Sequence, residues 1–471
     1  MTSTREKNRG PASSHAAIVE SLTSRWPEHR IGPTLVRIQA LCELLGSPQD
    51  ACPVIAVTGT NGKGSTAAMI DALLRSMGLR TGRFTSPHLQ EITERICIDG
   101  APIEAARFDE LWEQISPMVD IVDARRIDGI ALTFFEVMVA LAYAAFADAP
   151  VDVAIMEVGM GGRWDATNVA DARVGVVGPV DMDHMQYLGT TIGQIAAEKA
   201  GIIKPGATAV LAGQRPEAAA VLSRHCAEVG ATMVREGLDF ALLDRQVAVG
   251  GQLLRLEGAG GPVGDLFLPL HGAHMAHNAA VAVAAVEAFC GGRPIDPAVL
   301  AEGLAGVRAP GRLEAIHHDP LVVLDTAHNP HGVRATLAGL REAFTMRPAI
   351  GVLAMMADKQ VDAVLDLLAA ELDQVVVTTV RSSPRAMSVE DIASLAVGAF
   401  GRARVHTAED TAEALSRAMT LAGGAGEEAG VLVIGSVHLA GEARDILADD
   451  ASGVAVDPLT MSVVEEPDGS S

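Results

Sequence analysis

The sequence contains few aromatic residues and no concentration of positive charge. Phe, Trp and Tyr make up 3% of the 471 residues, and 36 Lys and Arg against 59 Asp and Glu give a formal net charge of −23. Nucleic-acid-binding proteins need basic surfaces and, for single strands, aromatic stacking platforms. The composition therefore excludes nucleic acid as a partner. It also means that an anionic substrate needs a locally positive site.

Cysteine is scarce, and no two cysteines have the spacing of a metal-binding motif. The five lie far apart, at Cys42, Cys52, Cys97, Cys226 and Cys290. This pattern favours reduced, mostly buried thiols over disulfides. Long apolar runs are absent too, because the longest, at residues 131–147, is interrupted by Glu136 and is too short to span a bilayer. Residues 1–14 lack the apolar region of a signal peptide, so we expect a cytoplasmic protein without a membrane partner.

A strand, a glycine-rich turn and a helix are predicted in succession between residues 54 and 77. Val54–Val57 is a short apolar run, and the turn that follows reads Thr58-Gly59-Thr60-Asn61-Gly62-Lys63-Gly64. From Ser65 the apolar residues recur at helical spacing. Glycines let backbone N–H groups approach an anion, while the helix N-terminus and a lysine add positive charge. This arrangement indicates a phosphate-binding loop.

The turn departs from the strict P-loop pattern at two positions. Val57 occupies the place of the first glycine, and Gly64 separates Lys63 from the hydroxyl of Ser65. A glycine-rich turn alone is often purely structural. The buried strand before it and the lysine within it favour phosphate binding.

Polar residues follow several of the predicted strands. The apolar run 151–156 ends at Glu157, the strand 174–177 leads to Asp183-His184, and Ser86 lies in a polar turn beside another strand end. In open parallel sheets, ligands bind at the carboxyl ends of the strands. A carboxylate such as Glu157 is often only a solvated loop residue. The glycines around it and the strand before it favour a place beside a phosphate and its metal.

Lys199 has an unusual position in a predicted helix over residues 191–204. It follows Ile192 by seven positions, about two turns, and so points from the apolar face. One interpretation is a lysine whose stem lies on apolar surface while its amine reaches water. The other is a desolvated, neutral amine with a chemical role near the metal.

The length of the chain predicts two or three domains. Segments with Gly-rich breaks between residues 240 and 270 predict hairpins, and the alternation of strands and helices after residue 320 indicates a doubly wound α/β domain. The predicted division is a flexible tail at 1–15, a first domain at 16–305, a linker at 306–312, a second domain at 313–450 and a disordered acidic tail at 451–471.

Several motifs occur along the chain in an order that is typical of one protein family. They are Gly59-Thr60-Asn61-Gly62-Lys63-Gly64-Ser65, Thr85-Ser86-Pro87-His88-Leu89, Thr133-Phe134-Phe135-Glu136, Glu157-Val158-Gly159-Met160-Gly161-Gly162-Arg163, Asp165-Ala166-Thr167-Asn168, Asp183-His184, Glu198-Lys199-Ala200-Gly201-Ile202, Pro310-Gly311-Arg312 and Asp325-Thr326-Ala327-His328-Asn329-Pro330. From about Pro33 to Leu447 the chain resembles the folylpolyglutamate synthase and dihydrofolate synthase family, a branch of the Mur ligase superfamily. The resemblance implies an α/β protein with an N-terminal P-loop-type ATPase domain and a C-terminal Rossmann-like, doubly wound domain.

The resemblance also implies roles for individual residues. The expected ATP-binding residues are Thr60, Asn61, Gly62, Lys63, Gly64, Ser65, Asn278, Arg312, Asp325 and His328. Metal ligands are expected at Ser86, Glu157, His184 and Lys199, with two Mg2+ ions that Mn2+ could replace and with Lys199 carbamylated. The pterin is expected near Phe135, Asp165 and Ala166, and the residues with catalytic roles are Lys63, Lys199 and His184.

The implied reaction joins L-glutamate to dihydropteroate, to the glutamate tail of a folate, or to both, with ATP as co-substrate and an acyl phosphate as intermediate. A monomer acting on small molecules is expected. One alternative is another Mur-type ligase that joins an amino acid to a peptidoglycan precursor. A second alternative is a nucleotide-binding regulator without ligation chemistry, which leaves Glu157, His184 and Lys199 unexplained.

Overall fold

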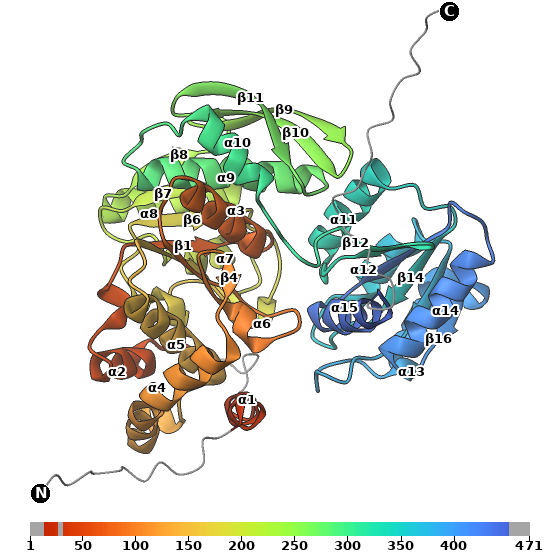
Figure 1. Cartoon of the computed structure of the whole chain (residues 1–471), viewed down its shortest axis with the longest axis horizontal. Coiled ribbons are helices and arrows are strands. Elements are labelled where there is room, and N and C mark those ends of the chain that lie inside the picture. Colours follow the sequence, from red (N-terminus) through yellow and green to blue (C-terminus); the bar gives the residue numbers. More distant parts are fainter. Residues whose placement is uncertain (1–13, 27–31, 452–471) are drawn as a thin grey trace, which may run out of the picture.

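The computed structural model describes residues 14–26 and 32–451, which form two α/β bodies side by side (Figure 1). Helix α1 (His15–Thr23) and helix α15 (Val437–Ala451) include one residue from each predicted tail, and Ser14 caps α1. Residues 1–13 and 452–471 of the two tails lie outside the described residues. The predicted linker at residues 306–312 falls between the last helix of the first body and the first strand of the second. The division into domains at these residues stays a prediction.

The first body is built on an eight-stranded sheet with the order β4-β3-β2-β5-β1-β6-β7-β8. The strands β2, β5, β1, β6, β7 and β8 are parallel, whereas β3 and β4 form an antiparallel edge. Their bounds are β1 Val54–Thr58, β2 Thr81–Phe84, β3 Ile96–Ile98, β4 Ala101–Pro102, β5 Val153–Glu157, β6 Val174–Val177, β7 Thr208–Leu211 and β8 Thr232–Arg235.

Both faces of this sheet are covered, which explains why its strands read as continuous apolar runs. On β1, Val54 and Ala56 contribute to one core and Ile55 and Val57 to the other, because successive side chains point to opposite faces. The first core contains residues of α1, α2 (Val36–Leu44), α4 (Ala105–Arg125), α5 (Phe134–Asp148), α7 (Ile192–Ala200) and α8 (Pro216–Val229). The second contains residues of α3 (Lys63–Ser76), α9 (Ala273–Phe289) and α10 (Pro297–Ala305).

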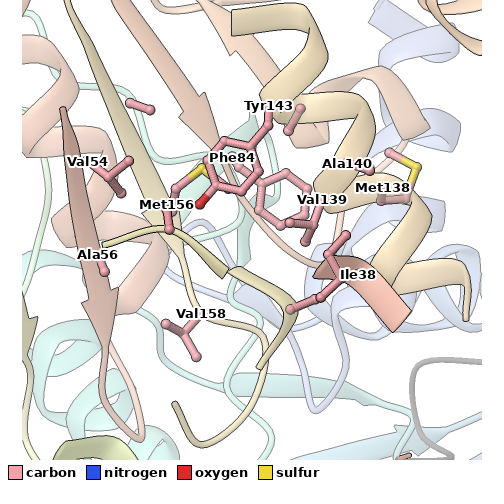
Figure 2. Close-up of a cluster of buried hydrophobic side chains, with 14 of the residues drawn as sticks. Ile38, Val54, Ala56, Phe84, Met138, Val139, Ala140, Tyr143, Met156 and Val158 are labelled. Carbon is pink, nitrogen blue, oxygen red and sulfur yellow. The ribbon is translucent and has the colours of Figure 1, made fainter. Parts of the chain in front are cut away.

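Figure 2 shows part of the first core, between the sheet and helix α5. The side chains of Phe84 and Met156 come from the strands, and Val139 and Tyr143 from the helix. The Tyr143 hydroxyl donates to the carbonyl oxygen of Thr167 at 2.9 Å, so its polar atom is satisfied inside the core. This packing holds α5 against the sheet, and the start of the helix borders the cleft described below.

A three-stranded antiparallel sheet follows in the chain and confirms the hairpins predicted between residues 240 and 270. It has the order β11-β10-β9, with β9 at Ala241–Ala248, β10 at Gly251–Gly258 and β11 at Gly261–Leu268. Its inner side chains, such as Leu254 and Leu266, join the second core of the first body.

The second body is a six-stranded sheet with the order β12-β13-β17-β14-β15-β16, parallel except for β12. Its strands are β12 Glu314–His318, β13 Leu321–Leu324, β14 Ala349–Leu353, β15 Gln374–Val377, β16 Val405–Thr407 and β17 Gly430–Ile434. Helices α11 (Pro330–Ala343), α12 (Val361–Ala369) and α13 (Val389–Phe400) pack on one face, and α14 (Thr411–Gly423) and α15 on the other. The predicted doubly wound α/β fold is thereby confirmed, while β12 was not predicted.

Short helical turns complete the described chain: α6 (Met185–Leu188), η1 (Pro48–Asp50), η2 (Ile92–Arg95), η3 (Ile127–Gly129), η4 (Ala166–Val169) and η5 (Arg402–Arg404). Among the described residues, no helix is both long and apolar enough to cross a membrane.

Candidate active site

The glycine-rich turn joins β1 to α3 and positions the start of that helix. Helix α3 begins at Lys63, two residues before the predicted change of period at Ser65, and Gly62 precedes it in the left-handed conformation with φ of 79°. A Cβ atom on Gly62 would lie 2.9 Å from the side-chain amide of Asn278. Both the backbone angle and this close approach therefore require glycine.

The Lys63 amine lies over the turn that precedes it. Its Nζ donates to the carbonyl oxygens of Gly59 and Thr60 at 3.3 and 3.4 Å. Among the described residues it forms no ion pair with a carboxylate. Because Lys63 also lines a cleft of about 390 Å³, its charge is available to an anion bound there.

Glu157 ends β5 beside this turn and is 5% exposed. One of its oxygens accepts the backbone N–H of Ser86 at 3.3 Å, and a Cβ on Gly64 would come within 3.3 Å of the same oxygen. Burial raises the pKa of Glu157, and the nearby Lys63 acts in the opposite direction. The structure thus brings together Glu157, Ser86 and the glycine turn, as the sequence predicts.

These atoms fit a hard cation. Carboxylate and hydroxyl oxygens are the ligands that Mg2+ prefers, and Mg2+ keeps waters and substrate phosphates in its shell. The described residues contain no group of three or more His, Cys, Asp or Glu that could hold a metal on side chains alone. A metal at Glu157 would therefore need ligands beyond these four residue types, such as the hydroxyl of Ser86, waters and substrate phosphates.

Lys199 is buried on α7, with 4% of the residue exposed. Its Nζ donates to the carbonyl oxygen of Gly59 at 2.8 Å, so the amine reaches the back of the glycine turn and not the solvent. Burial, and next the charge of Lys63, lower the pKa of Lys199 to about 7. A substantial fraction of this amine is neutral near neutral pH.

His184 precedes α6 in the left-handed conformation with φ of 48° and lines the cleft. Burial lowers the pKa of its imidazole to about 3, so the ring is neutral under ordinary conditions. Its neighbour Asp183 forms an ion pair with Lys359 of the second body at 3.3 Å. The ion pair holds the Lys359 ammonium group at the cleft, and the sequence analysis did not predict this cation.

The second body supplies several of the other predicted residues. Arg312 and His328 line both the first cleft and a second cavity of about 480 Å³, which Asn278, Ser65 and Asp325 also line. The Asn278 amide donates to the Ser65 hydroxyl at 3.0 Å, and burial lowers the pKa of His328 to about 4. The two cavities meet at the glycine turn, because Asn61 and Gly62 line both of them.

Asp325 is 3% exposed and its oxygens are occupied within the protein. They accept from the backbone N–H groups of Leu313 and Ala327 and from the Thr336 hydroxyl, at 2.8 to 3.0 Å. These bonds hold the chain after the linker against β13 and α11. Asp325 therefore orients its loop, in addition to lining the second cavity.

The residues predicted to contact a pterin line the other end of the site. Phe135, Asp165 and Ala166 all line the first cleft, and the Phe135 ring meets the edge of Phe84 with centroids 5.8 Å apart. Asp165 accepts from Met160 N–H and from the N–H and hydroxyl of Thr167. Burial raises the pKa of Asp165, while these hydrogen bonds act in the opposite direction.

Some cleft residues were missed by sequence reasoning, and several of them come from the second body. Lys359 follows β14 by six residues, so the rule that polar residues collect after parallel strands could have selected it. Arg385 also lines the cleft but lies in an irregular segment without such a signal. Asn329 is part of a motif noted in the sequence, yet its contacts across the two bodies were not predictable from that motif.

A P-loop on a parallel sheet that faces a second α/β domain across a nucleotide-sized cavity is the architecture of a Mur ligase. Residues 113–286 match the family described as "Mur ligase middle domain", and residues 311–437 match "Mur ligase, glutamate ligase domain". The class predicted from the motifs is thereby confirmed.

Comparison with individual relatives identifies the branch of this family to which the chain belongs. The chain is 47% identical over 453 residues to the dihydrofolate synthase/folylpolyglutamate synthase of Mycobacterium tuberculosis, covering 91% of this chain and 93% of the relative. It is 30% identical over 445 residues to the Escherichia coli protein of the same name, covering 94% and 97%. The chain therefore belongs to the dihydrofolate synthase/folylpolyglutamate synthase family.

Solved structures agree with this assignment. The Mycobacterium tuberculosis folylpolyglutamate synthase complexed with ADP superimposes with a TM-score of 0.88 at 46% identity, covering 92% of this chain and 98% of that one. The Escherichia coli FolC protein in complex with DHPP and ADP gives a TM-score of 0.81 at 28% identity, covering 93% and 99%.

Proposed function

We propose that this chain is an ATP-dependent ligase that joins L-glutamate to dihydropteroate and to the glutamate tail of tetrahydrofolate. Family membership gives the class of reaction. The observation that supports it most directly is the convergence of Lys63 and Glu157 from the first body with Arg312 and His328 from the second around one cleft. A cleft of this kind has room for a nucleotide phosphate between two groups of polar side chains.

The first step joins two anions, because a substrate carboxylate attacks the γ-phosphate of ATP to form an acyl phosphate and ADP. Positive charge must offset their repulsion. Lys63, at the N-terminus of α3, and Arg312, the last residue of the predicted linker, are the cations that would bind the transferred phosphate. The backbone N–H groups of the glycine turn add hydrogen-bond donors that need no reorganisation.

We propose that Ser86, Glu157, His184 and Lys199 hold Mg2+, at two sites, with Mn2+ as a possible substitute. When bound, the metal neutralises phosphate charge as a Lewis acid. The neutral imidazole of His184 has a lone pair free for a cation. The Lys199 amine becomes an oxygen ligand if its neutral nitrogen bonds to CO2 and releases one proton, which gives a carbamate.

The second step needs L-glutamate with its amine directed at the acyl carbon. The amine attacks, a tetrahedral intermediate forms, and phosphate leaves as the amide is made. Gly435, Ser436, Val437 and His438 line the cleft after β17, and we propose that they shape the glutamate site. Phe135 and Ala166 would contact the pterin ring, and Asp165 would accept from its N–H groups with its remaining lone pairs.

Steady-state assays with dihydropteroate and with tetrahydrofolate monoglutamate, side by side, test this function. We expect glutamate-dependent ADP release with both substrates, and inactivity on both would contradict the assignment. A nucleotide-binding regulator would bind ATP without that release. Thermal shifts with dihydropteroate and with a UDP-linked sugar distinguish the folate branch from a peptidoglycan ligase, since only the correct acceptor stabilises the fold.

We further propose that the enzyme works as a monomer in the cytoplasm on small-molecule substrates. All five cysteines are free, which is consistent with a reducing compartment. Size-exclusion chromatography with light scattering should give the mass of one chain.

A further inference from the structure

Asn329 joins the two bodies through a side chain whose hydrogen-bonding capacity is fully used. It is the N-cap of α11, 3% exposed, and its Oδ1 accepts the N–H of Gly332 at 2.8 Å. Its Nδ2 donates to a carboxylate oxygen of Asp183, in the first body, at 3.0 Å. These two partners fix the orientation of the amide, because Gly332 requires an acceptor and Asp183 requires a donor.

The remaining hydrogen bonds of Asn329 go to Asn61 in the glycine turn. Asn61 Nδ2 donates to Asn329 Oδ1 at 3.2 Å, and Asn329 Nδ2 donates to Asn61 Oδ1 at 3.0 Å. The two amides thus form a reciprocal pair across the domain boundary. His331, the second residue of α11, accepts from Asn61 Nδ2 at 2.9 Å and adds a further bond to the same residue.

The pair lies where the two cavities meet. Asn61, Gly62, Arg312 and His328 line both the cleft and the second cavity, so a nucleotide that extends between them passes this point. The pair therefore touches the phosphate-binding turn on one side and the helix that follows the His328 loop on the other.

We propose that the Asn61–Asn329 amide pair is an interdomain latch: it holds the second body in the position where Arg312 and His328 face the phosphate-binding turn. Both asparagines act here as positioning residues, through the groups that they bring together. When the amide pair is broken, the second body moves away from the turn. Loss of the pair therefore lowers the rate of the ATP-dependent step more than it lowers the stability of the fold.

Two further contacts between the bodies lie away from the glycine turn. Arg245 on β9 forms an ion pair with Glu342 on α11, and His271 meets the edge of Phe344 with centroids 4.9 Å apart. These residues line neither cavity. They show that the bodies touch at more than one place, and they supply a matched control for the latch.

A double-mutant cycle tests the proposal with the full-length enzyme. Asn61→Ala removes one amide, and Asn329→Ser removes the other while keeping a side chain that caps α11. We expect each single variant to lower kcat/KM for ATP roughly tenfold, which corresponds to two net hydrogen bonds. The double variant should lose little more than either single one, because both changes break the same pair.

Three further measurements complete the test. Small-angle scattering with AMPPCP and Mg2+ should give a larger radius of gyration for both single variants than for the wild type. This readout needs nucleotide binding but no ligation, so it stands apart from the proposed function.

Glu342→Gln should change kcat/KM less than twofold, since an exposed ion pair contributes little. Thermal unfolding identifies any variant that fails to fold, in which case the other single variant and the scattering carry the test.

If the loss of kcat/KM in the double variant equalled the product of the two single losses, the latch would be overturned. An unchanged radius of gyration, or an equal loss in Glu342→Gln, would do the same, because either result removes the special role of the pair.

Discussion

The Lys63 amine has little role in holding the fold together, so its charge is free for the proposed phosphate site. Within the described part of the chain, its hydrogen bonds go only to two carbonyl oxygens of its own turn, at 3.3 and 3.4 Å. We expect Lys63→Ala to lower kcat by at least about 100-fold, the loss seen when one group that stabilises a transition-state anion is removed. The melting temperature should stay close to that of the wild type. Glutamate-dependent ADP release and circular dichroism measure the two effects.

Lys204→Ala is a suitable control for this prediction. Lys204 is also a partly buried lysine, which donates to the carbonyl oxygen of Asn168 and pairs with Asp171, but it lines neither cavity. Equal activity losses in the two variants would mean that Lys63 is not specific to the phosphate.

Lys199 should respond to CO2 in a pH-dependent way. Only the neutral amine reacts with CO2, and burial lowers the pKa of Lys199 to about 7, so activation by bicarbonate should rise as pH rises through 7. We expect Lys199→Ala to be nearly inactive and to regain part of its activity with added short carboxylic acids, whose carboxylate can occupy the vacated space. Rates with and without bicarbonate, measured from pH 6 to 8, check this. A fully active Lys199→Ala enzyme would end the carbamate hypothesis.

At the scale of residues, the sequence predicted best those side chains that follow a strand or break a helical pattern. Glu157 was selected because it ends an apolar run, and Lys199 because an amine occupied an apolar face. Both are buried beside the glycine turn. The ion pair of Asp183 with Lys359 was not predictable, because it depends on how the second body approaches the first.

Helix α5 begins with a network that ties two segments of the first body together. Thr133 and Glu136 cap each other's backbone N–H groups, and Glu136 also accepts from Arg37, whose side chain is 2% exposed. Arg37 in turn donates to the carbonyl oxygen of Gly32 at the edge of the cleft. The network thus connects the start of α5, where Phe135 lies, to the segment before α2.

We expect Glu136→Ala to lower the free energy of unfolding by about 3 kcal/mol, because it leaves the buried Arg37 without its main carboxylate partner. Urea denaturation followed by circular dichroism measures the change. Arg107→Ala is the control: its partners Glu110 and Asp148 are exposed, and its loss should cost less than about 1 kcal/mol. A cost below 1 kcal/mol for Glu136→Ala would contradict the role of this network.

Sequence patterns predicted those helices and strands whose apolar residues form a continuous run or recur at one regular spacing. The buried strands of both sheets and the helices at the phosphate site were predicted from apolar runs and helical spacing. Strand β12 was missed because its residues, Glu314–His318, are mostly polar and sit at the sheet edge. Helix α4 was not singled out, although its five buried residues, Phe108, Leu111, Ile115, Val119 and Val122, recur at helical spacing.

For the whole molecule, the fold of each body could be predicted but the contact between them could not. Periodicity reports which face of an element is buried, and it carries no signal for a few polar side chains that meet across a cleft. The reciprocal pair of Asn61 and Asn329 is such a contact, 268 positions apart in the chain. The two cavities exist only because both bodies line them.

Two arginines on the linker allow a test of whether residues beyond the first body help to bind the nucleotide phosphates. Arg308 and Arg312 each donate to the carbonyl oxygen of the preceding residue, at 3.0 and 3.3 Å, but only Arg312 lines the cavities. We expect Arg312→Ala to lower kcat about 100-fold, because a cation that offsets the phosphate charge is removed. Thermal stabilisation by ATP should also shrink, since nucleotide contacts from the second body are lost. Arg308→Ala, which removes the same charge from the same linker, should keep both properties. If the two variants behaved alike, the linker's net charge would explain the effect, and the second body would have no direct part in phosphate binding through Arg312.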